Sequence, residues 1–419
     1  MSLTAEILSI GTELLLGDIT NTDAQAIAQE LGALGINVYF QTVVGDNPER
    51  IRRAVEIAKS RADLIVTTGG LGPTYDDITK QTLAESFGLP LEMHEPTVER
   101  IRSYFERRGG TMTENNLLQA VLPRGCTVLE NDWGTAPGVA FEANGKVVVM
   151  LPGPPRECEP MLRERVLPYL KKFSDAALVS RNIRVVGLGE SAMEYRLHDR
   201  IVSMTNPTVA PYAKTFECLL RVTARAETSE EARAMTEPVV EEICRELGDV
   251  VYGVDADSLE SVVFELLRSR GLTLAAAESC TGGMFGERFT SVPGASEVYR
   301  GGVCSYSNDL KVNLLGVDAG LIERLGAVSA EVAQQMAEGV RRACGADIGI
   351  GITGVAGPAE SERKPAGLVY IAVADAAGVA VRELHLGRGR ERVRTGAVVS
   401  TLDLVRRRVL GLPVNPQDD

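Results

Sequence analysis

One residue of this chain that could act as a nucleophile is a serine in a glycine-rich turn. Ser279 lies in the segment Glu-Ser-Cys-Thr-Gly-Gly, which follows an apolar, strand-like run and precedes a helical pattern. We expect Ser279 at or near the N-cap of that helix, with the backbone N–H groups of Thr281, Gly282 and Gly283 pointing outward, where they favour negative charge. Ser279 then either only caps the helix or is a nucleophile inside an oxyanion hole.

A serine nucleophile needs a base, and Lys311 is the best candidate in the same part of the chain. The chain contains 36 Arg and only 8 Lys, and between residues 259 and 410 the lysines are Lys311 and Lys364. A buried lysine can lose its proton whereas arginine cannot, and Ser–Lys pairs are an established variant of the catalytic triad. His385 lies in a strand pattern and is interpreted as structural. Cys280 is interpreted as a buried structural thiol.

A second group of candidate residues lies near the N-terminus, where glycines precede two carboxylates. The segment Thr-Thr-Gly-Gly-Leu-Gly-Pro-Thr-Tyr-Asp-Asp follows a strand-like run and contains Gly69, Gly70, Gly72, Asp76 and Asp77. Ligands of open parallel sheets bind where the strands end, so the segment favours a phosphate-bearing ligand. Carboxylates without histidine favour Mg²⁺ or a similar divalent ion, and the candidate metal ligands are Asp77, Asp76, Glu13 and Asp18. The alternative is a helix N-terminus whose two Asp interact with the helix dipole.

The elements that must position these residues alternate between strand and helix patterns. In the first 90 residues, strands are predicted at 5–10, 36–44 and 64–68 and helices at 22–34 and 47–60, which indicates a parallel, doubly wound sheet. Asn144-Gly145 between two apolar runs predicts a hairpin. A helix at about 157–172 closes this part.

The rest of the chain divides into a small module and a third part. Residues 173–253 show strands and two helices without a cluster of catalytic groups, which indicates a small α+β module. The third part is predicted to contain the strand that enters Ser279, a helix capped by Ser329, a hairpin across 376–378 and a last helix at 390–410. Arg406–Arg408 on that helix are interpreted as a solvated face or a dimer rim.

Composition limits the function classes. The chain has 419 residues, 44% hydrophobic and 24% charged, and its formal net charge is −13 with a pI near 5.0. An acidic chain without a basic field is not expected to bind nucleic acid through overall charge. The longest apolar runs are of strand length, so no membrane partner is expected. Seven scattered cysteines indicate reduced thiols and a cytoplasmic location.

Three segments in the third part carry a family resemblance. AESCTGG, SYSNDLKVNLLGV and GITGVAGP resemble the nicotinamide mononucleotide deamidase domain at the C-terminus of the CinA family (competence/damage-inducible protein A). The resemblance implies that Ser279 is the nucleophile and that Tyr306 and Lys311 activate it. It further implies that Thr353, Gly354 and Gly357 hold the nucleotide, together with an arginine near the last helix. We favour Arg390 over Arg394, although GRGRERVR offers several.

The N-terminal part carries a second resemblance. TTGGLGPTYDDIT, NDWGTAPG and LPGPPRE are similar to segments of the molybdopterin-binding fold of the MoaB, MogA and MoeA proteins. That likeness implies that Asp77 contacts the ligand, and the CinA family associates the domain with metal-dependent ADP-ribose hydrolysis. The middle segment resembles the KH-like module of the same family. It has no clear GxxG turn, so RNA binding is not expected.

The sequence therefore predicts an α/β protein of three domains. These are a doubly wound, molybdopterin-binding-like domain (1–172), a KH-like α+β module (173–253) and an α/β/α deamidase domain (254–419). The expected protein is a bifunctional, cytoplasmic hydrolase of pyridine-nucleotide salvage that acts on nicotinamide mononucleotide and on ADP-ribose. The second activity is expected to use a divalent metal and the first no cofactor, and the family implies a homodimer. The alternative is a molybdopterin-like binding protein or a competence accessory factor without catalysis in the N-terminal domain.

Overall fold

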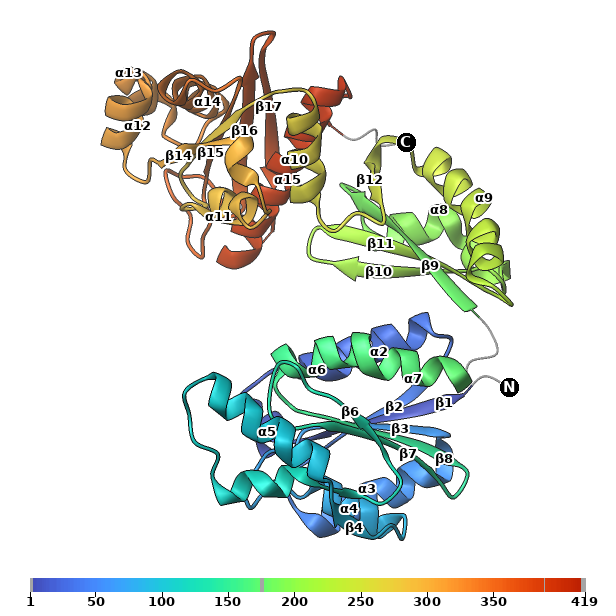
Figure 1. The fold of residues 1–419 in the computed structure, drawn as a ribbon. Coiled ribbons are helices and arrows are strands. Elements are labelled where there is room, and N and C mark those ends of the chain that lie inside the picture. The colour runs from blue at the N-terminus through green and yellow to red at the C-terminus, as the bar shows by residue number, and fades with distance from the viewer. Residues whose placement is uncertain (1–2, 174–176, 388, 416–419) are drawn as a thin grey trace. The chain divides into compact units, whose positions relative to one another are not determined.

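The computed structural model describes residues 3–173, 177–387 and 389–415. These form two compact units, one of residues 3–173, 177–179 and 224–234 and the other of residues 180–223, 235–387 and 389–415 (Figure 1). Two predictions fall on or next to residues outside these ranges. The predicted domain boundary after residue 172 lies beside residues 174–176, and one arginine of the GRGRERVR segment is residue 388. Both of these lie outside the described residues.

The first unit is built on a six-stranded sheet with helices on both faces (Figure 1). In sheet order, the strands are β2 (Asn37–Val44), β1 (Thr4–Ile10), β3 (Leu64–Thr68), β8 (Lys146–Leu151), β7 (Gly138–Ala143) and β6 (Thr127–Leu129). One face is covered by α2 (Thr22–Ala33), α6 (Pro155–Met161) and α7 (Leu167–Leu170), and the other by α3 (Pro48–Arg61) and α4 (Thr79–Ser86). The remaining α-helices and strands among its described residues are α1 (Thr12–Leu16), α5 (Glu95–Arg107) and the short pair β4 (Leu91–Met93) and β5 (Val121–Pro123).

The predicted parallel, doubly wound arrangement of the first 90 residues is confirmed, and the strands that follow make the complete sheet mixed. β2, β1, β3 and β8 run parallel, whereas β7 and β6 run antiparallel. The cause is the predicted hairpin at Asn144-Gly145. Both residues have left-handed φ angles, 54° and 72°, as the tight turn between two antiparallel strands requires.

The middle segment forms a second, four-stranded sheet. Its order is β10 (Thr208–Lys214), β11 (Glu217–Ala226), β9 (Ala177–Val186) and β12 (Val251–Val254). The helices α8 (Glu190–Ser203) and α9 (Ser229–Leu247) lie on one face of it (Figure 1). An apolar core that includes Met193, Leu197 and Ile243 lies between helices and sheet.

The last part contains a five-stranded sheet between two helical layers. In sheet order, the strands are β14 (Tyr299–Cys304), β13 (Leu274–Glu278), β15 (Ile348–Gly354), β16 (Leu368–Asp375) and β17 (Gly378–His385). One core contains residues of α10 (Leu259–Ser269), α11 (Met284–Thr290) and α15 (Arg390–Leu410). The other face carries α12 (Asn308–Leu315), α13 (Ala319–Leu325) and α14 (Ala330–Cys344). Ser329 caps α14 as predicted, because its side chain accepts from the N–H of Val332.

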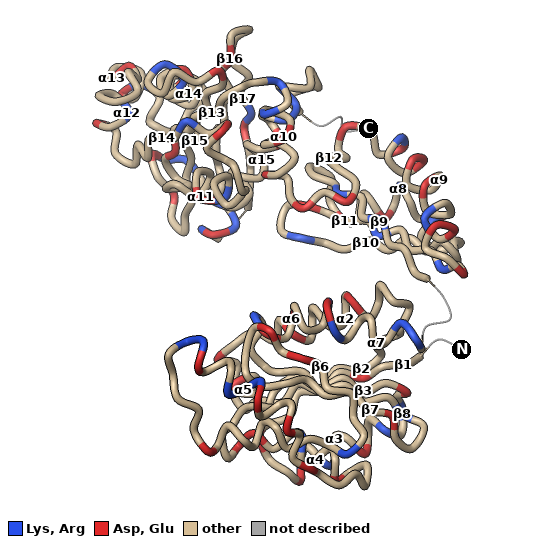
Figure 2. Tube along the Cα trace, in the orientation of Figure 1, with Lys and Arg blue, Asp and Glu red and all other residues tan. Residues whose placement is uncertain are grey.

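Charged residues of both signs are interspersed along both units (Figure 2). No described helix combines the length and the apolar character that crossing a lipid bilayer would require.

The prediction of an exposed arginine face on the last helix is wrong for Arg406 and Arg407. The Arg407 side chain is 0% exposed and forms ion pairs with Asp403, 2.8 Å away, and Asp249, 2.7 Å away. Arg406 also pairs with Asp403, and so does Arg382 from β17. Helix periodicity turns these residues inward, so the arginines tie α15 to the segment before β12.

Replacing Asp403 by Asn is expected to lower the free energy of unfolding by about 3 kcal/mol, because the change leaves the buried guanidinium groups of Arg382 and Arg406 without their counter-charge. Asp375→Asn is the matched control, since Asp375 pairs with Arg408 where both side chains are about a quarter exposed. That control is expected to cost about 1 kcal/mol or less. Urea unfolding followed by circular dichroism measures both. Equal losses would show that the buried ion pairs of Asp403 contribute no more to the free energy of unfolding than the more exposed pair of Asp375.

Candidate active site

The three predicted motifs of the last sheet meet because three parallel strands end side by side. β13 pairs in parallel with β14, placing Glu278 opposite Cys304, and with β15, placing Glu278 opposite Ile352. Ser279, Ser305 and Thr353 directly follow Glu278, Cys304 and Ile352 in the chain, so these three residues lie side by side. The carboxyl ends of neighbouring parallel strands are where such sheets bind ligands.

Lys311 reaches Ser279 from the first turn of α12. Ser307 caps this helix, and the amine nitrogen Nζ of Lys311 lies 3.1 Å from the hydroxyl oxygen Oγ of Ser279. The same amine donates to the carbonyl oxygen of Ser305 at 2.7 Å. Lys311 is only 1% exposed, and this burial lowers its pKa from the ordinary value of 10.5. The arrangement is a serine hydroxyl beside an amine whose neutral form is favoured.

Cys280 is the neighbouring group that could compete as nucleophile. Its side chain is buried, and burial raises the pKa of its thiol to about 12. The thiolate is the reactive form of cysteine, so this environment disfavours nucleophilic attack. The interpretation of Cys280 as a buried thiol agrees with the structure.

The prediction that Ser279 caps the following helix is wrong. α11 begins at Met284 with Gly283 as its N-cap, and a turn separates it from Ser279. The buried carboxylate of Glu278 performs the capping role, since it accepts hydrogen bonds from the backbone N–H groups of Gly283, Phe285 and Gly286. Sequence reasoning overlooked Glu278, although an acidic residue at the end of a strand and before a helix is a usable signal.

This capping changes the predicted set of outward N–H groups. Gly283 donates to Glu278, and Gly282 donates to the carbonyl oxygen of Ser279 itself at 3.1 Å. Both groups are therefore occupied in this structure. The side chain of Thr281 is buried, and its hydroxyl has no hydrogen-bond partner among the described residues.

Tyr306 and Arg390 form the outer side of the site. Tyr306 is 61% exposed, and its hydroxyl accepts from Nη2 of Arg390 at 3.0 Å. Nη1 of Arg390 donates to the carbonyl oxygen of Gly357. Arg394 instead donates twice to the carbonyl oxygen of Thr281. Arg390 thus borders the pocket, whereas Arg394 holds the turn after Ser279.

These residues enclose a pocket of about 280 Å³. Its lining includes the predicted Ser279, Tyr306, Lys311, Thr353, Gly354, Gly357 and Arg390, together with Asn308 and Glu362, which were not predicted. The hydroxyl of Thr353 donates a hydrogen bond to the carbonyl oxygen of Ala327, which joins two segments of the pocket lining. The structure therefore brings these seven predicted residues together, whereas the predicted Thr281, Gly282 and Gly283 are not part of the lining.

The predicted ligand site of the first unit lies at the carboxyl end of β3. Gly69 has a φ of 99°, and a Cβ on it would lie 2.0 Å from the carbonyl oxygen of Ile10, so only glycine fits between the strand ends. Gly70 is pressed equally closely against Thr79. Gly72 lies over the carboxylate of Asp77, which accepts from both the N–H and the hydroxyl of Thr74.

The predicted metal ligands are not gathered into one site. Asp76 and Asp77 both accept from the hydroxyl of Thr74. Glu13 lies on the short helix α1, and Asp18 follows the end of that helix. Among the described residues, no group of three or more His, Cys, Asp or Glu side chains could hold a metal ion. These residues therefore do not fit a preformed metal site.

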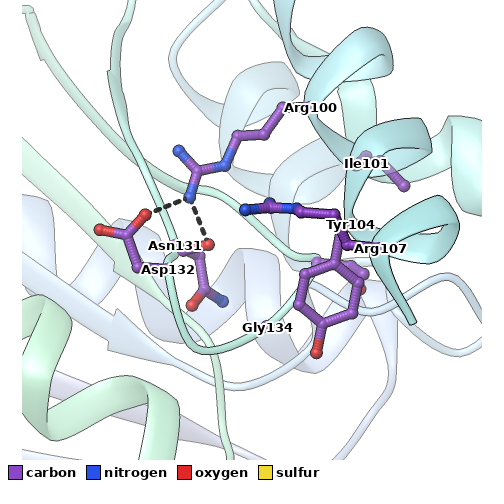
Figure 3. A pocket seen from close by; sticks show the side chains of 8 residues that line it. Arg100, Ile101, Tyr104, Arg107, Asn131, Asp132 and Gly134 are labelled. Atoms are coloured by element: carbon purple, nitrogen blue, oxygen red, sulfur yellow. Dashed lines mark hydrogen bonds and ion pairs between the residues drawn. The ribbon is translucent and has the colours of Figure 1, made fainter.

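Another pocket of the first unit, of about 160 Å³, lies between α5 and the loop at 131–135 (Figure 3). Arg100 on its wall is bound to the carboxylate of Asp132 and to the carbonyl oxygen of Asn131. Its charge is thus already compensated within the protein.

Comparisons with known proteins cover nearly the whole chain. The model of the CinA C-terminal domain matches residues 256–409, that of a probable molybdopterin binding domain matches 6–172, and that of the damage-inducible protein CinA KH domain matches 180–253. A CinA-like protein of Dictyoglomus thermophilum is 50% identical over 408 residues, which cover 97% of this chain and 99% of that protein. A putative competence-damage inducible protein of Clostridium acetobutylicum is 48% identical with the same coverage.

Among solved structures, the protein CinA with unknown function from Thermoplasma acidophilum is similar to part of the chain. It shares 34% identity, with a TM-score of 0.37, over 41% of this chain and 98% of that one.

Proposed function

The chain belongs to the CinA family, and from this premise we propose that its last domain hydrolyses the amide of nicotinamide mononucleotide to nicotinate mononucleotide and ammonia. One observation carries the proposal. The buried amine of Lys311 lies 3.1 Å from the hydroxyl of Ser279 on the wall of a pocket large enough for a pyridine ring. A serine beside a neutral lysine suits acyl transfer.

The first half of the proposed reaction forms an acyl-enzyme. Neutral Lys311 accepts the proton of Ser279 as the serine oxygen attacks the amide carbon. The protonated amine then returns this proton to the leaving nitrogen, the carbon–nitrogen bond breaks, and ammonia departs. The ester between Ser279 and the nicotinoyl group remains. The carbonyl oxygen of Ser305 supports both steps, since it accepts one N–H of Lys311 and orients the amine.

The second half releases the acid. Lys311 removes a proton from water, the water oxygen attacks the ester carbon, and the bond to Ser279 breaks as the serine oxygen regains its proton. The sum is one amide and one water converted to one carboxylate and one ammonium ion. Arg390, bound to Tyr306 and to the carbonyl oxygen of Gly357, is the cation available to the nucleotide phosphate at the outer side of the pocket.

Ser279→Ala is expected to abolish ammonia release from nicotinamide mononucleotide, because the variant has no oxygen to acylate. Cys280→Ala is the matched control and is expected to keep most of the activity, since the buried thiol remains protonated. A coupled assay for ammonia measures both variants. Loss of activity in Cys280→Ala with retention in Ser279→Ala would reverse the assignment.

The reaction rate is expected to rise with pH as Lys311 loses its proton, with the midpoint below 10.5 because burial lowers the pKa of this amine. Arginine at position 311 keeps the charge but cannot act as the base, so Lys311→Arg is expected to reduce kcat by roughly 10²-fold or more and to remove the rising limb. Profiles of kcat/KM against pH test this. A variant that keeps near-normal turnover would exclude Lys311 as the base.

For the first domain we propose binding and hydrolysis of ADP-ribose to AMP and ribose 5-phosphate. The supporting observation is that Gly69 lies close to the carbonyl oxygen of Ile10 at the end of β1 and Gly70 close to the side chain of Thr79 at the start of α4. Residues 69 and 70 therefore place main chain and no side chain of their own at the carboxyl edge of the sheet. The described carboxylates form no preformed metal site. Any divalent ion would therefore need phosphate and water for most of its ligands.

Asp77→Ala is expected to abolish ADP-ribose hydrolysis, because the carboxylate of Asp77 orders the turn at Thr74 beside the glycine segment. Ammonia release is expected to remain unchanged, since its candidate residues belong to another domain. AMP is measured by chromatography with added Mg²⁺ and with EDTA. No AMP from the wild-type protein under any divalent ion would favour a binding role for this domain.

A further inference from the structure

The pocket around Ser279 has opposite charges on two of its walls. Arg390 lines it from the start of α15, and Glu362 lines it from the loop between β15 and β16. Glu362 is the only acidic side chain among the described residues that line this pocket. The proposed reaction makes no use of it. A pocket with one fixed cation and one fixed anion is complementary to a ligand that carries both charges.

The carboxylate of Glu362 is held in place by its surroundings. Its Oε2 atom accepts from the backbone N–H of Val328 at 3.3 Å and lies 3.8 Å from the amine of Lys364. That amine is itself fixed, because it donates to the carbonyl oxygens of Leu325 and Val328. Lys364 compensates part of the charge of Glu362, but at 3.8 Å the pair is loose, and the Glu362 side chain remains about a third exposed.

The backbone at this position is strained. Glu362 and Arg363 both adopt left-handed φ angles, 54° and 58°, in a turn closed by pairing between Ser361 and Lys364. A non-glycine residue in this region costs about 1 kcal/mol or more, and such strain persists where the surrounding structure imposes it. The strained turn is therefore located where it holds this carboxylate in the lining of the pocket.

We infer, on the basis of the proposed function, that Glu362 is a specificity-determining residue that selects substrates with a positively charged ring. Nicotinamide mononucleotide carries a pyridinium cation and a phosphate anion, which match Glu362 and Arg390. The product carries an additional carboxylate, which Glu362 repels, so the same residue favours release of the acid. A reduced, dihydropyridine ring is uncharged and gains nothing from Glu362.

The test compares two substrates that differ in ring charge, nicotinamide mononucleotide and its dihydro form. Glu362→Gln removes the charge but keeps an oxygen that can accept from Val328. It is expected to lower kcat/KM for the cationic substrate by about fivefold, mainly through KM, because the site is partly exposed and Lys364 compensates part of the charge. The value for the neutral substrate is expected to change by less than about twofold. Glu360→Gln, in the same loop but outside the lining, is the matched control and should change neither.

A second measurement needs no variant. The mononucleotide in which an acetyl group replaces the amide cannot release ammonia, and it exists in a cationic and a reduced, neutral form. The cationic form is expected to inhibit the wild-type protein more strongly. Equal inhibition by both forms, or an equal loss on both substrates in Glu362→Gln, would overturn the inference. Failure of the wild-type protein to release ammonia from nicotinamide mononucleotide would instead overturn the proposed function.

Discussion

The parallel pairing of β13 with β14 on one side and β15 on the other is the constraint on which the candidate active site depends. It places the ends of three strands at one edge, where Ser279 and the Ser305 carbonyl approach the amine of Lys311 from two strands. A shift of one residue in either pairing would exchange the two faces of the strand and separate these groups. The chemistry therefore rests on strand register before it rests on any single side chain.

Glycines in β15 allow the helix behind the sheet to hold that register. A Cβ on Gly349 would lie 2.1 Å from the carbonyl oxygen of Ala337, and a Cβ on Gly351 would lie 2.1 Å from that of Ala333. The backbone of α14 thus lies directly against the strand, which only glycine permits. Close packing of this kind leaves little freedom for the end of β15, which carries Thr353, and for the loop that follows, which carries Gly357.

Arg407 and Lys311 are two buried basic side chains whose hydrogen-bond partners determine which protonation state is favoured. Arg407 is completely buried but has carboxylates of Asp403 and Asp249 beside it, so it stays charged and serves to join segments. Lys311 is equally buried, yet its two hydrogen-bond partners, Ser279 and the Ser305 carbonyl, are neutral oxygen atoms. Desolvation without a bound counter-charge favours the neutral amine, which is the form that can accept a proton. Arginine could not make that change.

By itself, the sequence determined the class of fold, the helix capped by Ser329 and the choice of Ser279 and Lys311 as candidate nucleophile and base, because these follow from local periodicity, capping residues and residue type. It did not reveal that Glu278 rather than Ser279 caps α11, or that Arg407 is buried, because capping and burial depend on which residues approach from distant segments. The role assigned to Glu362 likewise depends on tertiary structure. A single glutamate in a loop has no periodic signal, and only the folding of that loop against Val328 brings its carboxylate to the pocket that Ser279 and Lys311 share.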